Sequence, residues 1–236
     1  MSNEEEDFGN NEEEDFGNDE EVIIDDDDED EIELDESFEL PPRADTPEES
    51  EDNVMEDLVQ RFNPKTGAAK RLLSDLREMM KNDPKELGFS TEPMNNDIFN
   101  WEVRLFGFEK GTDIEKDMIK YKQKTGRDYI KMVVTFPPDY PNLPPFVRVV
   151  EPRFMFRTGR ITTGGSLCTD VLTMESWNPM YDICSLMINI SAEIMDGKPR
   201  VDFSNPTPYS LEEARAAYFR VASDHGWKVS KWVPTK

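Results

Sequence analysis

The chain has 236 residues, of which 52 are acidic and 27 are basic, and its formal net charge at pH 7 is −25. Residues 1–60 contain 29 of the acids and a single base, Arg43, so the remaining 23 acids and 26 bases give residues 61–236 a net charge of +3. A chain with this excess of acids repels phosphates, which argues against direct nucleic-acid binding.

Several further classes of protein are excluded by what the sequence lacks. Two cysteines are too few for the disulfide framework of a small secreted protein, so we expect a reducing compartment, the cytoplasm or the nucleus. No apolar run approaches the roughly 20 residues that span a bilayer, and the N-terminus has no signal-peptide pattern, so we expect no membrane association. One histidine, no cysteine pair at metal spacing and no glycine-rich phosphate loop predict no metal and no bound cofactor.

Residues 1–60 are predicted to form a disordered acidic tail, because they contain too few apolar side chains to offset the entropy lost on ordering. The octapeptide NEEEDFGN occurs twice, at Asn3–Asn10 and Asn11–Asn18, which is too few repeats to build a continuous core. We therefore place the boundary of the folded domain at residue 61 and assign residues 61–236 to that domain.

The first elements of the domain follow from hydrophobic spacing. Apolar residues on one face predict a helix over 68–80, which Asn82-Asp83-Pro84 ends. Residues 99–106, 129–136 and 146–150 are predicted strands, and the polar segment 113–126 is loop-like or partly helical. Five prolines within residues 137–145 form a rigid connection, because proline cannot donate to a sheet ladder.

Two helices are expected to follow. Apolar residues at positions 183, 186, 187, 190 and 194 predict a helix over 181–195, with Gly197 as its C-cap. Ser210 is the predicted N-cap of a last helix that runs to about Ser223. Strands followed by helices indicate an α+β fold.

Three motifs then occur in a fixed order. Tyr140-Pro141-Asn142-Leu143-Pro144-Pro145 precedes Gly164-Gly165-Ser166-Leu167-Cys168, and Trp177-Asn178-Pro179 follows. Over about residues 65–227 this arrangement resembles the ubiquitin-conjugating enzymes. The segments 144–150, 190–192 and 197–201 are similar to the Q-type branch of that family. The resemblance implies the ubiquitin-conjugating fold, a four-stranded antiparallel meander with flanking helices.

The resemblance also implies an acyltransferase. Cys168 would accept ubiquitin from the activating enzyme as a thioester and pass it to a protein substrate or to a ligase, with ATP consumed upstream. A free cysteine has a pKa of roughly 8.5, so a few per cent is thiolate at neutral pH. We interpret Gly164 and Gly165 as keeping the backbone beside the sulfur open to partners. Cys184 is expected to be a structural core residue, and His225, placed after the last helix, is not expected to be catalytic.

The groups that assist transfer are not fixed by a motif. The family's usual His-Pro-Asn triplet is absent near Thr158-Gly159-Arg160, as it is in the Q-type branch. We hypothesise that the oxyanion is stabilised by one of the hydroxyls or backbone N–H groups of the segment before Cys168, namely Thr162, Thr163, Gly164, Gly165 and Ser166. Asp202 and Asp196 are the candidate proton acceptors, since the family often places an acid after this helix.

Partner contacts are likewise implied by the resemblance. Lys70 and Arg71 match positions that meet the activating enzyme, the alternative being a solvated helix face. The positions of the family's two ligase loops are occupied here by Asn142, Leu143, Asn178, Pro179 and Met180. Relatives often have phenylalanine at the position of Asn142, which weighs against the usual RING-type ligases.

Two other interpretations stay open. The domain could be a non-catalytic interaction module of the ubiquitin pathway with the same fold, although Cys168 in register argues against this. Alternatively, the acidic tail is the functional part, binding basic partners, and the domain is its carrier.

Overall fold

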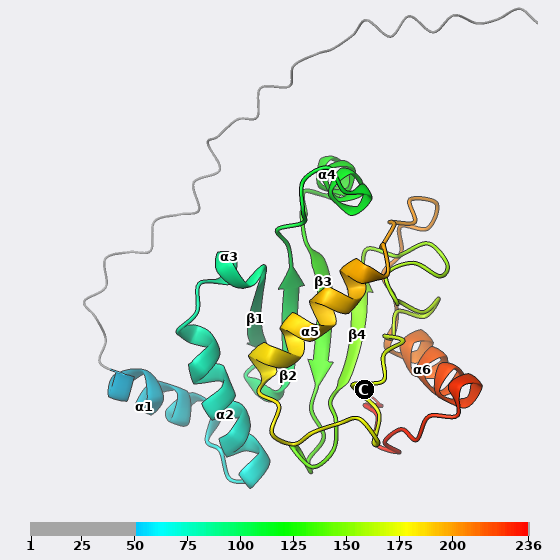
Figure 1. Cartoon of the computed structure of the whole chain (residues 1–236). Helices are drawn as coiled ribbons and strands as arrows, with labels where there is room; N and C mark the ends of the chain where they lie inside the picture. Colours follow the sequence, from blue (N-terminus) through cyan, green and yellow to red (C-terminus); the bar gives the residue numbers. More distant parts are fainter. Residues whose placement is uncertain (1–50, 236) are drawn as a thin grey trace, which may run out of the picture. The chain divides into compact units, whose positions relative to one another are not determined.

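The structure is a computed structural model that describes residues 51–235. Its centre is one antiparallel sheet in which every strand pairs with its neighbour in sequence, in the order β1-β2-β3-β4 (Figure 1). The strands are β1 (Phe89–Met94), β2 (Asp97–Leu105), β3 (Ile130–Thr135) and β4 (Phe146–Glu151). The predicted four-stranded meander is confirmed.

The helices lie around this sheet, with α5 crossing one of its faces and α6 beside the edge formed by β4 (Figure 1). They are α1 (Glu51–Phe62), α2 (Gly67–Met80), α3 (Pro84–Leu87), α4 (Asp113–Thr125), α5 (Ile183–Asp196) and α6 (Leu211–His225). No helix among residues 51–235 is long and apolar enough to cross a membrane.

The main core contains the buried faces of the sheet and of α5, together with those of α2 and α4. In β2, Trp101, Val103 and Leu105 alternate with polar residues and stand opposite buried residues of β3. In α5 the buried side chains are those at the predicted positions, Ile183, Leu186, Met187, Ile190 and Ile194. The segment that follows β4 is bonded to this sheet, for example through the Val149 N–H and the Gly165 carbonyl.

The predicted boundary of the tail is wrong over residues 51–60, which belong to α1. Val54, Met55, Leu58 and Phe62 recur at helical spacing and pack against the main core, with Leu58 buried. The acids around them hide this face when composition is averaged over the whole segment. The rest of the predicted tail, residues 1–50, lies outside the described residues.

Two other elements differ from expectation. The edge strand β1 was not predicted, because it is short and contains Pro93, which only an edge strand tolerates readily. The polar segment 113–126 is a full helix, α4, capped by the side chain of Thr112 and by Gly126 in the left-handed conformation.

Candidate active site

Cys168 lies in the long segment between β4 and α5 and lines a cleft of about 740 Å³. Its sulfur is partly exposed, and its N–H donates to the carbonyl of Arg160 at 2.7 Å. We call this cavity the thiol cleft; its walls are formed by Phe156, Arg157, Arg160, Ile161, Thr162, Thr163, Cys168, Asp196, Gly197, Arg220, Val221, Asp224 and His225. Among residues 51–235 no cluster of His, Cys, Asp and Glu could hold a metal ion.

A tight turn over residues 162–166 fixes the position of Cys168. The Gly165 N–H donates to the Thr162 carbonyl, and the Thr162 N–H donates to the Ser166 carbonyl, both at 2.9 Å. The hydroxyls of Thr162 and Ser166 are also 2.9 Å apart. The Gly165 carbonyl accepts from Val149 of β4 at 2.7 Å, so the turn is attached directly to the sheet.

The interpretation of Gly164 and Gly165 as an approach route for partners is wrong. Both residues are buried, and a Cβ at Gly164 would collide with the Glu213 carbonyl and the Ala217 side chain of α6. A Cβ at Gly165, where φ is +90°, would lie 2.6 Å from the Tyr209 ring. The glycines therefore allow α6 and Tyr209 to pack directly on the turn.

The predicted catalytic groups are only partly brought together. Thr162, Thr163 and Asp196 line the thiol cleft with Cys168, whereas the predicted backbone donors at residues 164–166 are not among its walls. Ser166 is fully buried, and the Gly165 N–H is already bonded within the turn. Asp202 also lies outside the walls, and its carboxylate accepts from the backbone N–H of Ser204 at 2.9 Å.

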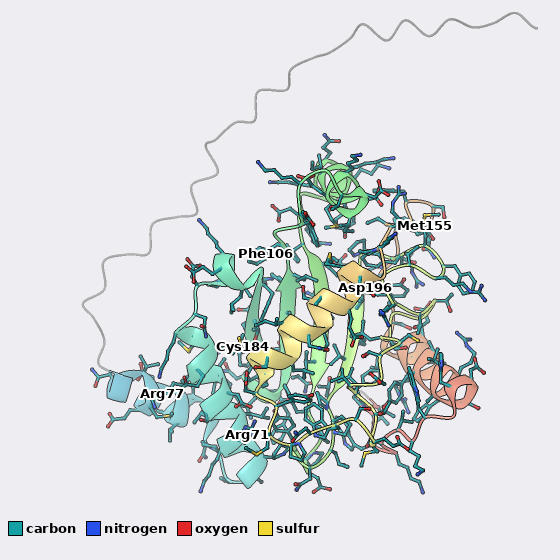
Figure 2. The ribbon with its side chains drawn as sticks, viewed as in Figure 1. Arg71, Arg77, Phe106, Met155, Cys184 and Asp196 are labelled. Carbon is teal, nitrogen blue, oxygen red and sulfur yellow. The ribbon has the colours of Figure 1, made fainter. Side chains whose placement is uncertain are left out.

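Asp196, at the C-terminal end of α5 (Figure 2), is paired with Arg160 at 2.7 Å. Arg160 in turn acts on the thiol. Burial raises the pKa of Cys168, the positive charge of Arg160 lowers it, and the negative charge of Glu193 raises it, with a net shift upward. The sulfur is therefore mostly protonated at neutral pH, and a nearby proton acceptor is chemically useful.

His225, which the sequence does not predict to be catalytic, lies beside this thiol. Its Nε2 lies 3.8 Å from the Cys168 sulfur, and its ring stacks on Trp227 with 4.5 Å between ring centroids. The prediction ended the last helix near Ser223, whereas α6 extends to His225 and Gly226 caps it in the left-handed conformation. Two features of the sequence could have pointed to His225: it is the one histidine of the chain, and the family's His-Pro-Asn triplet is absent.

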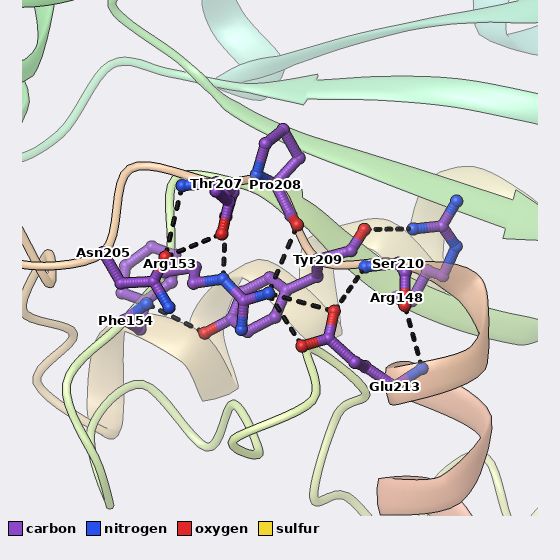
Figure 3. A network of polar contacts seen from close by, with 9 residues as sticks. All are labelled: Arg148, Arg153, Phe154, Asn205, Thr207, Pro208, Tyr209, Ser210 and Glu213. Atoms are coloured by element: carbon purple, nitrogen blue, oxygen red, sulfur yellow. Dashed lines mark hydrogen bonds and ion pairs between the residues drawn. The ribbon is translucent and has the colours of Figure 1, made fainter.

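The start of α6 is held by the polar network drawn in Figure 3. Arg153 donates to both carboxylate oxygens of Glu213, at 2.8 and 2.9 Å, and to the Thr207 carbonyl at 2.7 Å. Glu213 and Ser210 form a capping box, and the Tyr209 hydroxyl accepts from the Phe154 N–H at 2.9 Å. This network attaches α6 beside the turn, so the far end of the helix brings His225 to the sulfur.

A family model described as "Ubiquitin-conjugating enzyme" matches residues 71–225. The chain belongs to the ubiquitin-conjugating enzyme family.

Similar proteins place it with the Q-type branch. "Ubiquitin-conjugating enzyme E2 Q1" of Homo sapiens is 33% identical over 165 residues, which cover 68% of this chain and 39% of that protein. This chain thus spans only 39% of the length of that relative. A Mus musculus protein named as a Q-like ubiquitin-conjugating enzyme is 29% identical over 58% of this chain and 86% of its own length.

Human ubiquitin-conjugating enzyme E2 G1 is a similar solved structure, with 25% identity, a TM-score of 0.44, and coverage of 55% of this chain and 96% of that one.

In this ubiquitin-conjugating family member, the two residues predicted to meet the activating enzyme differ in their surroundings. Lys70 is exposed on α2. Arg71 instead donates to both oxygens of Asp75, at 3.0 and 3.1 Å, to the Pro179 carbonyl at 3.1 Å, and to the Tyr181 carbonyl at 2.7 Å. Arg71 therefore joins α2 to the loop after Trp177 and is not a freely solvated helix residue.

The two predicted ligase loops lie next to each other. The indole N–H of Trp177 donates to the Pro141 carbonyl at 2.7 Å, and this contact joins the loop of Asn142 and Leu143 to that of Asn178, Pro179 and Met180. Residues 178–180 are exposed, and Met180 has 82% of its surface accessible. The hydrogen bond thus holds the two loops together.

Cys184 lies near the N-terminal end of α5 (Figure 2), is partly buried, and packs against the main core. Burial and the charge of Asp182 raise the pKa of its thiol. It is not among the residues that line the thiol cleft.

Proposed function

We propose that Cys168 accepts ubiquitin from the activating enzyme as a thioester and transfers it to a protein substrate or to a ligase. Membership of the family supports the reaction class. The observation that carries the assignment to this residue is the 3.8 Å separation between the Cys168 sulfur and His225 Nε2 at a partly open cleft.

The first step forms one thioester and breaks another. The Cys168 sulfur attacks the ubiquitin carbonyl carbon, and the thiol of the activating enzyme leaves. The proton of Cys168 must be removed, because the thiolate is the nucleophile. His225 is placed to take this proton, and Arg160 favours the thiolate through its charge.

The second step forms a bond from the acceptor atom to the same carbonyl carbon, and the Cys168 sulfur leaves as thiolate. The acceptor atom is a nitrogen or oxygen of the substrate or a cysteine sulfur of the ligase. The acceptor must lose a proton, a requirement that is strictest for a hydroxyl. His225 is the proton acceptor we assign, since its Nε2 lies 3.8 Å from the sulfur that carries the acyl group. Stacking on Trp227 orients the ring toward the sulfur.

Thr162 and Thr163 remain the proposed side-chain support for the oxyanion. Both line the thiol cleft. The Thr163 hydroxyl accepts from Arg220 at 3.0 Å, which leaves its own O–H available to donate to an oxyanion, and the Thr162 hydroxyl lies 2.9 Å from that of Ser166. Unchanged discharge to lysine in a variant with both threonines replaced by valine would remove this part of the proposal.

The decisive experiment incubates the full chain with activating enzyme, ATP and ubiquitin, followed by a non-reducing gel. We expect a thiol-sensitive adduct that becomes a thiol-resistant ester, or is lost, in Cys168→Ser. Cys184→Ser serves as the matched control and retains the adduct. Absence of any adduct in the unmodified chain would leave the non-catalytic interaction module as the function.

A further inference from the structure

Two arginines in the thiol cleft have no acidic partner within residues 51–235. Arg160 is paired with Asp196, but Arg157 makes only a contact with the adjacent Phe156 ring, 5.0 Å from its guanidinium carbon to the centroid. Arg220 donates to the neutral Thr163 hydroxyl at 3.0 Å. Other surface arginines of the domain, such as Arg127 and Arg200, are paired with carboxylates at 2.7 Å.

The arginine and aspartate side chains on the cleft walls have a net positive charge, which favours the binding of an anion. Arg157, Arg160 and Arg220 carry three positive charges, and Asp196 and Asp224 carry two negative charges. Since Asp196 is occupied by Arg160, only Asp224 opposes an anion at the other two guanidinium groups of these walls. A guanidinium offers paired N–H donors that match a carboxylate.

The backbone gives a second, independent indication that this wall is specialised. Arg157 and Arg160 adopt positive φ angles of 62° and 52°, a left-handed conformation that non-glycine residues rarely take. Such conformations are kept where the surrounding structure imposes them, and they cluster at functional sites. Here they belong to the short segment that lines the cleft between Phe156 and Cys168.

We propose that Arg157 and Arg220 bind an acidic side chain of the acceptor, so that the enzyme selects acceptor sites flanked by Asp or Glu. The inference rests on the proposed function, because the acceptor nucleophile must reach Cys168 within the same cleft. A cavity of 740 Å³ is about 11 Å across if taken as a sphere, which is about three residues of extended chain. The acid therefore lies within about three residues of the acceptor.

The test uses two labelled peptides that differ only in Glu or Gln two residues after a single acceptor lysine. Binding to the full chain is measured by fluorescence anisotropy, and single-turnover discharge from the ubiquitin-loaded chain is measured in parallel. We expect the Glu peptide to bind about five-fold more tightly and to be modified with an about five-fold higher kcat/KM through a lower KM. The preference should decrease as salt is added.

Arg157→Gln and Arg220→Gln should each reduce the preference for the Glu peptide, and the double variant should abolish it. Arg61→Gln, on α1 and outside the cleft, is the matched control and should retain it. Discharge to free lysine reports on the general chemistry. If that discharge proceeds but both peptides bind and react equally, or if the double variant keeps the preference, the acidic-acceptor site is refuted and the proposed function stands. If no thioester forms, the proposed function fails, and the anisotropy difference alone decides whether the arginines bind the acid.

Discussion

Cys168 is a half-buried thiol whose charged and polar neighbours come from three different segments. Arg160 precedes it in the chain, Glu193 lies on α5, and His225 ends α6. Burial and Glu193 oppose ionisation of the sulfur, whereas Arg160 favours it. Because the net effect raises the pKa of Cys168, a neighbouring base increases the fraction of thiolate more than it would for an exposed cysteine.

The raised pKa of Cys168 can be measured by alkylation in a Cys184→Ser background. Because the thiolate reacts and burial raises the pKa of Cys168, the half-maximal rate of iodoacetamide labelling should lie at a pH above the ordinary cysteine pKa of roughly 8.5. Arg160→Gln should move the midpoint further up, and Glu193→Gln should move it down. Equal midpoints in all three proteins would contradict this account of the electrostatics.

Replacing His225 tests its role as proton acceptor. In His225→Gln, discharge of ubiquitin to lysine should slow by about a hundred-fold, the scale of general acid–base catalysis. Loading from the activating enzyme should be less affected, since part of the thiol ionises without a base. Ser223→Ala, exposed on the same helix, is the control; a full rate in His225→Gln would exclude the imidazole from catalysis.

At the scale of elements, the site depends on how closely α6 approaches the turn at residues 162–166. Gly164 and Gly165 permit the contact, and Arg153 with Glu213 holds the start of the helix. The turn fixes the sulfur relative to the sheet, and α6 fixes the imidazole relative to the turn. The cysteine–histidine pair is thus a product of helix docking.

Gly164→Ala should therefore damage both stability and activity. Its added methyl group overlaps backbone and side-chain atoms of α6, so we expect a loss of about 1–3 kcal/mol in the free energy of unfolding, measured with urea. Discharge should fall as His225 moves from the sulfur. Gly67→Ala, where no atom lies within 4 Å of the added carbon, is the matched control and should change stability by less than about 0.5 kcal/mol.

Across the whole domain, polar contacts join segments that are distant in the sequence. Asp75 on α2 accepts from Arg71 and from the Tyr140 hydroxyl, at 3.2 Å for the latter, while Arg71 reaches the loop after Trp177. Burial raises the pKa of Asp75 despite the neighbouring arginine. This cluster connects the first part of the domain to both predicted ligase loops.

Removing the guanidinium should leave the Asp75 carboxylate buried without its counter-ion. Arg71→Gln is expected to lower the free energy of unfolding by about 2–3 kcal/mol, less than a fully buried pair because Arg71 remains partly exposed. The neighbouring Lys70→Gln should leave stability unchanged within about 0.5 kcal/mol. A slower loading rate in Lys70→Gln, measured with the activating enzyme, would support the predicted contact at this exposed position.

Features that depend on short windows of sequence were determined by the sequence itself. Helical spacing in α5 and alternation in β2 specify buried faces locally, and the ordered motifs around Tyr140, Cys168 and Trp177 specify the family. The start of the domain was predicted too late in the chain, because acidic residues surround the apolar face of α1. Strand β1 was not predicted, because its proline is acceptable only at a sheet edge.

Pairings between distant residues were decided only by the tertiary structure. His225 is 57 positions from Cys168, and Arg71 is 108 positions from Pro179, so no local periodicity relates them. From the sequence, Gly164 and Gly165 are interpreted as an open backbone beside the sulfur. In the structure they are instead the residues on which α6 and Tyr209 pack. Side-chain chemistry lists the groups that can react, but packing decides which of them meet.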